Sequence, residues 1–105
     1  MRCLAIAGRV LWMLGAVTPA VPAFAADAGN GERLARRWCA ACHVVAADQR
    51  GTTGEAPPFA TIARTPDFAP SRLAFFLLDP HPKMPDMGLS RAAAEDIAAY
   101  IASLR

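Results

Sequence analysis

The residues with the clearest chemical potential are Cys39, Cys42 and His43, which stand in the pattern Cys-x-x-Cys-His. This is the spacing at which two thiols form thioether bonds to a c-type haem. Positions three apart lie on neighbouring sides of one helical turn, so both sulfurs can reach the two vinyl groups on one edge of the ring. The following histidine can present a neutral imidazole nitrogen to the iron. The pattern therefore predicts haem attachment at Cys39 and Cys42, with His43 as the proximal ligand.

A second iron ligand is expected from the stretch 79–88, whose three prolines prevent a helix and stiffen the backbone. Met84 and Met87 both lie there, and no other methionine follows residue 25. A thioether binds iron softly, favours the ferrous state and so raises the reduction potential. We expect Met84 to be the distal ligand, because Met84-Pro85 occupies the stiffest part of this stretch.

Two other side chains in the same stretch are alternatives to Met84. Met87 could bind the iron, or it could pack over the edge of the ring. His81 would give a haem with two histidine ligands and a lower potential. A lone histidine between prolines is more often exposed, which makes His81 the less favoured ligand.

Residues 1–25 have the three regions of a Sec-type secretory signal peptide. A basic start with two arginines is followed by an apolar run at 10–17 and by a small-x-small cleavage site that ends at Ala25. The apolar run is well short of the roughly 20 residues that a membrane-spanning helix needs. We expect cleavage after Ala25 or, alternatively, after Ala26, export to the periplasm, and no stable membrane insertion after cleavage.

Removal of this segment changes the charge and the cysteine content. The precursor carries a formal charge of +2, but the loss of Arg2 and Arg9 leaves nine basic against nine acidic side chains. No basic stripe remains that would indicate nucleic-acid binding. Cys3 is also lost, so the motif holds both remaining cysteines. Residues 26–105 are expected to form a single domain with a marginal core, in which a covalently held haem would add apolar surface for packing.

The elements that must position the ligands are predicted to be helices. They are expected at 28–42 with Asp27 as N-cap, at 59–63, near 70–78, and from 91 with Ser90 as N-cap. The intervening segment 44–58 is rich in glycine and proline and is predicted to be a loop.

The first and last helices are expected to pack together. Gly31 costs about 1 kcal/mol of helix propensity relative to alanine, which makes sense where another helix crosses closely. The last helix carries one apolar stripe at the spacing of a single helical face: Ile97, Tyr100, Ile101 and Leu104. The natural partner of this stripe is the first helix around Gly31 and Leu34.

Two further segments are expected to serve the haem. A metal-bound histidine usually donates its second ring N–H to a carbonyl or carboxylate, and the stiff Pro57-Pro58 stretch can present such a carbonyl to His43. The helix near 70–78 is expected to supply haem-wall and core residues, namely Leu73, Phe75, Phe76, Leu77 and Leu78.

From residue 26 to 105 the sequence resembles the class I cytochrome c family in its small bacterial, single-haem form. The resemblance rests on the Cys-x-x-Cys-His motif after a helix with Gly31, the proline turn before Phe59, the Met84-Pro85 stretch and the terminal helix with Tyr100. It implies an all-α cytochrome c fold, in which three to five helices wrap around one covalently attached haem c and the N- and C-terminal helices cross. One departure is that Ala56-Pro57-Pro58-Phe59 replaces the usual Gly-Pro-x-Leu run.

The resemblance implies haem attachment at Cys39 and Cys42, iron ligation by His43 and Met84, and electron transfer in the periplasm. We expect a monomeric one-electron carrier between a redox donor and acceptor, and no enzyme activity. Alternatives are a haem-c subunit of a dehydrogenase complex and, if Met84 does not bind, an open-site haem protein with peroxidase or gas-binding activity. A thiol–disulfide module is disfavoured because its βαβ context is missing.

Overall fold

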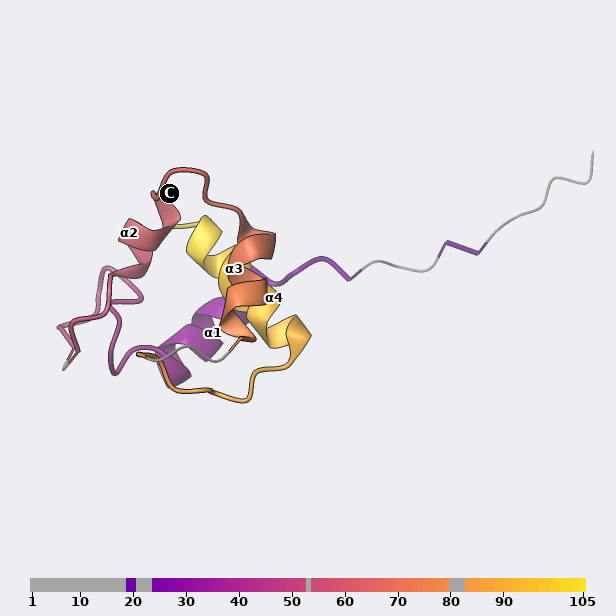
Figure 1. Ribbon diagram of the computed structural model, residues 1–105. Helices are drawn as coiled ribbons and strands as arrows, with labels where there is room; N and C mark the ends of the chain where they lie inside the picture. Colours follow the sequence, from indigo (N-terminus) through magenta and orange to yellow (C-terminus); the bar gives the residue numbers. More distant parts are fainter. Residues whose placement is uncertain (1–18, 21–23, 53, 80–82) are drawn as a thin grey trace, which may run out of the picture.

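The computed structural model describes residues 19–20, 24–52, 54–79 and 83–105. The regular elements of these residues are four helices, α1 (Ala28–Trp38), α2 (Phe59–Ala63), α3 (Pro70–Leu77) and α4 (Arg91–Ala102). Helix α4 packs against each of the other three; in Figure 1, α1, α3 and α4 lie together and α2 lies to one side. No strand occurs in the described part of the chain, so the predicted all-α class is confirmed.

Helix α1 begins where predicted but ends four residues earlier. The Asp27 carboxylate accepts a hydrogen bond of 3.0 Å from the Asn30 backbone N–H, which confirms it as the N-cap. At the other end, the carbonyl of Ala35 accepts from the N–H groups of both Cys39 and Ala40, at 2.8 and 3.1 Å. The regular hydrogen-bond ladder therefore stops after Trp38, and the cysteine motif occupies a separate turn.

Helices α1 and α4 cross at Gly31, as predicted. A Cβ atom added to Gly31 would overlap the Asp96 carbonyl group and lie 2.9 Å from Tyr100 Cβ. The Asp96 carboxylate adds a polar contact at the crossing, since it accepts from the Asp27 backbone N–H at 2.7 Å and from Asn30 Nδ2 at 2.6 Å. Only a residue without a side chain lets the two backbones approach this closely.

The predicted stripe of α4 forms the centre of the core. Ile97, Tyr100 and Ile101 are buried, and Leu104 packs at the edge of the same cluster. The cluster also contains Phe59 from α2 and residues of the segment that follows α1. The apolar stripe of α4, near the C-terminus, thus packs both against α1 and against the middle of the chain.

Helix α3 differs from the prediction in its orientation. Ala74 is its buried residue, and it packs against Ala94 and Ala98 of α4. Phe75 and Phe76 are 71% and 50% exposed, so neither belongs to the protein core, while their expected place in the haem wall stays a prediction. The contact is made by small side chains, which brings the helices close and turns the two aromatic side chains outward. Leu73, Leu77 and Leu78 are half-buried against the core clusters.

No helix in the described ranges is both long enough and apolar enough to cross a membrane.

Substitution of Gly31 by alanine tests the crossing. We expect Gly31→Ala to lower the free energy of unfolding by about 1–3 kcal/mol, because the new methyl group meets backbone that cannot move aside. The matched control is Gly29→Ala in the same helix, where the added Cβ would lie 3.3 Å from an oxygen of the exposed Asp27 side chain and would meet no backbone of another helix. This control should be neutral or slightly stabilising through helix propensity. Equal denaturation midpoints for the two variants would contradict the close crossing.

Candidate functional site

The two cysteines and the histidine of the motif lie in one tight turn after α1. The Cys39 carbonyl accepts from the Cys42 N–H at 3.1 Å and from the His43 N–H at 2.8 Å. Cys39 is buried, Cys42 is exposed, and both thiols are free. One thiol thus lies against the core and the other on the surface, and the imidazole follows directly.

The His43 ring is held by a backbone carbonyl, as predicted. Its Nδ1 lies 2.7 Å from the carbonyl oxygen of Pro57, which identifies Pro57 rather than Pro58 as the partner. A carbonyl can only accept, so Nδ1 carries the proton and Nε2 is left with its lone pair, as metal binding requires. The Phe59 ring packs on the imidazole with 5.2 Å between centroids. The donor set and its orientation fit an iron porphyrin bound through Nε2.

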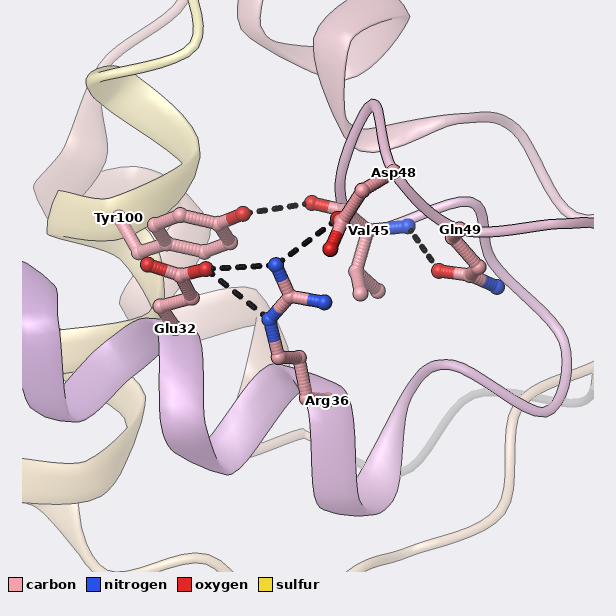
Figure 2. Close-up of polar contacts among 6 residues, drawn as sticks. All are labelled: Glu32, Arg36, Val45, Asp48, Gln49 and Tyr100. Carbon is pink, nitrogen blue, oxygen red and sulfur yellow. Dashed lines mark hydrogen bonds and ion pairs between the residues drawn. The ribbon is translucent and has the colours of Figure 1, made fainter.

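Tyr100 fixes the segment that follows the motif, a role that the sequence did not reveal. Its hydroxyl donates a buried hydrogen bond of 2.7 Å to the carbonyl of Val45, whose side chain is fully buried (Figure 2). Burial raises the pKa of Tyr100, so the phenol remains a donor at neutral pH. The next carbonyl back, that of Val44, accepts from the Phe59 N–H at 3.0 Å. The segment that follows His43 is thereby bonded both to Tyr100 of α4 and to Phe59, which lies two residues after Pro57.

An exposed ion pair joins α1 to the same segment. Arg36 bridges Glu32, at 2.8 Å, and Asp48, at 2.9 Å, as Figure 2 shows. The pair with Glu32 has the i, i+4 spacing of one helix face, whereas no spacing rule relates the helix to Asp48 in the loop. The hydrogen bond from Arg36 lowers the pKa of the Asp48 carboxyl group. Because the groups are solvent-exposed, this pair is a secondary attachment of the segment.

The environment of Cys39 disfavours thiol–disulfide chemistry. Burial, with a smaller contribution from Cys42, raises the pKa of the Cys39 thiol to about 11. Redox-active thiols have a lowered pKa, because the thiolate is the nucleophile. Cys39 would stay protonated at neutral pH.

The two methionines lie in the segment that leads to α4. Met84 and Met87 are both half-buried, and neither belongs to the hydrophobic clusters of the described residues. A methionine in these positions does not fill a gap in the protein core, which is its usual role. Because both methionines are half-buried, their exposure gives no preference for either as the distal ligand. The alternative ligand His81 lies outside the described residues.

Comparison with known proteins adds two findings. Residues 26–101 match the family model described as cytochrome c oxidase, cbb3-type, subunit III. The chain is also 58% identical over 93 residues to a cytochrome c-552 of Bradyrhizobium diazoefficiens, with 89% of each chain covered. No solved structure gives a significant match.

Removal of the Tyr100 hydroxyl tests how firmly the segment after the motif is held. We expect Tyr100→Phe to cost about 1–3 kcal/mol of stability in the mature protein, because the Val45 carbonyl loses a buried donor. Ser103→Ala is the control, since the Ser103 hydroxyl donates to the Tyr100 carbonyl at an exposed position. Its effect should stay within about 0.5 kcal/mol. A denaturation midpoint for Tyr100→Phe as high as that of the control would refute the importance of this hydrogen bond.

Proposed function

Because this chain belongs to the class I, mono-haem cytochrome c family, whose members bind haem c covalently, we propose that it carries single electrons between two redox proteins with its iron bound by His43 and Met84. Cys39 and Cys42 would hold the haem through thioether bonds. The haem, when bound, supplies a ferric/ferrous couple. Electron transfer of this kind needs no catalytic acid or base.

The observation that carries the proposal is the hydrogen bond between His43 Nδ1 and the Pro57 carbonyl. It fixes the tautomer and the direction of the ring and raises the basicity of the opposite nitrogen. Such an arrangement suits a permanent ligand that must not move when the iron changes its charge. Phe59 limits rotation of the imidazole from one side.

Met84 is proposed as the opposite ligand on chemical grounds. It precedes Pro85 and is half-buried outside the core, in a stretch that proline keeps from becoming helical. Two protein ligands would leave no open position for peroxide or a gas, which favours a carrier over an open-site haem protein. Met87 remains the alternative, because it has the same chemistry and the same degree of burial.

Two methionine variants test the ligand assignment. The oxidised protein should show the weak sulfur-to-iron charge-transfer band in the red part of its optical spectrum. We expect the band to disappear in Met84→Ala and to persist in the matched variant Met87→Ala. The reverse pattern would make Met87 the ligand, and a wild-type protein without the band would overturn methionine ligation altogether.

We propose export to the periplasm with cleavage after Ala25. Phe24 is 95% exposed, and Ala25 and Ala26 on the two sides of the proposed cut and its alternative are exposed as well. Asp27, two residues after the proposed cut, is joined to the domain through its N-cap bond to Asn30 and its bond to Asp96. Of the residues before this point that the structure describes, all are exposed, so cleavage there would take none of them from the core.

N-terminal sequencing of the protein purified from its natural compartment tests the export. We expect the sequence to begin at Ala26. A start at Asp27 would move the cleavage site by one residue, and a chain that still begins at Met1 would contradict cleavage.

The protein is proposed to act as a free monomer. The matching family model is described as a subunit of a cbb3-type oxidase. The relative named cytochrome c-552, however, is similar over 89% of its own length, so the likeness is to nearly the whole of that protein. A single-domain carrier that docks transiently on a donor and an acceptor is consistent with this extent.

A further inference from the structure

The side chain of Gln49 lies within hydrogen-bonding distance of several backbone groups of its loop and of the motif turn. Its Oε1 accepts from the Val45 N–H at 2.9 Å, a contact drawn in Figure 2. Its Nε2 lies 2.9 Å from the carbonyl oxygens of both Ala40 and His43, and 3.1 Å from that of Gly51. One side chain thus connects four backbone groups between residues 40 and 51.

The chemistry of these groups matches a primary amide. Three carbonyl oxygens face the nitrogen. Because an amide nitrogen has only two hydrogens, one of these hydrogens is shared between two carbonyl acceptors. A single N–H faces the oxygen. A flipped amide would place oxygen against carbonyls and nitrogen against an N–H, so the network fixes the orientation of the group. Glutamate could keep the contact with Val45 but would turn a second acceptor toward the carbonyls.

Gln49 lies where the motif turn needs hydrogen-bond donors, because α1 ends at Trp38 and the turn lies beyond the regular helix. Carbonyl groups beyond the end of α1 have no helical donors, and Gln49 supplies donors to those of Ala40 and His43. His43 is therefore held at its ring by Pro57 and at its carbonyl by Gln49, in addition to the bond of its N–H within the motif turn. The exposed Arg36–Asp48 pair reaches the same loop only from outside.

We propose that Gln49 is a positioning residue for iron ligation by His43. It clamps the backbone of the motif turn to the following loop, so that the imidazole keeps one orientation relative to the haem plane in both oxidation states. This inference rests on the proposed role of His43 as the proximal ligand. Gln49 itself acts through the backbone and touches neither the iron nor the sulfur atoms.

The first test uses the unmodified holoprotein in its reduced, diamagnetic form. The side-chain N–H protons of Gln49 should exchange with solvent at least tenfold more slowly than those of an exposed glutamine, because several backbone carbonyls compete for them. Exchange at the rate of a free side chain would overturn the proposal without any substitution.

The second test uses Gln49→Met, which keeps the length of the side chain but removes both halves of the amide. We expect the Val45 N–H to exchange roughly tenfold faster, since it loses its acceptor. The haem-methyl NMR shifts of the oxidised protein, which report the orientation of the ligand imidazole, should move, and the reduction potential should change with them. Gln49→Glu should retain protection of the Val45 N–H while the haem-methyl shifts still move.

The control variant is Arg36→Gln, which cuts the exposed attachment of the loop. It should leave the haem-methyl shifts and the potential unchanged. Shifts in Gln49→Met no larger than in Arg36→Gln would limit Gln49 to a structural role and refute the proposal. Failure of the broader function is distinguishable, because it would appear in the wild-type protein as a missing charge-transfer band.

Discussion

The close crossing of α1 and α4 at Gly31 is the constraint on which the rest of the structure depends. It places the end of α1, and with it the motif turn, beside the apolar stripe of α4. Tyr100 can then reach the Val45 carbonyl across 55 residues of sequence. Without that approach the turn would still follow α1, but the segment after it would lose its bond to the core through Tyr100.

Patterns with a fixed period allowed most of the fold to be predicted. Both N-caps and the short helix after Pro58 appear where the sequence placed them, because each depends on neighbours within a few residues. The end of α1 was missed, since helix propensity continues through the motif while the hydrogen bonds do not. Phe75 was misplaced because its burial depends on which face of α3 meets the alanines of α4.

The candidate site divides in the same way between local and long-range information. Cys39, Cys42 and His43 are contiguous, so their chemistry could be predicted from spacing alone. The proline carbonyl was anticipated from the stiffness of the stretch, and only the structure identifies it as Pro57. Gln49 gave no signal, because an amide that binds backbone groups needs no recognisable partner residue.

The bond between the Asp27 N–H and the Asp96 carboxylate would have a consequence if the leader is cleaved as proposed. A leader cut one residue later, after Ala26, would turn this amide into a terminal ammonium group. A positive charge at the start of a helix opposes the helix dipole, but here it would form an ion pair with Asp96 at the crossing. Under the proposed cleavage, the Asp96 carboxylate would therefore hold the start of the first helix whether the chain began at Ala26 or at Asp27.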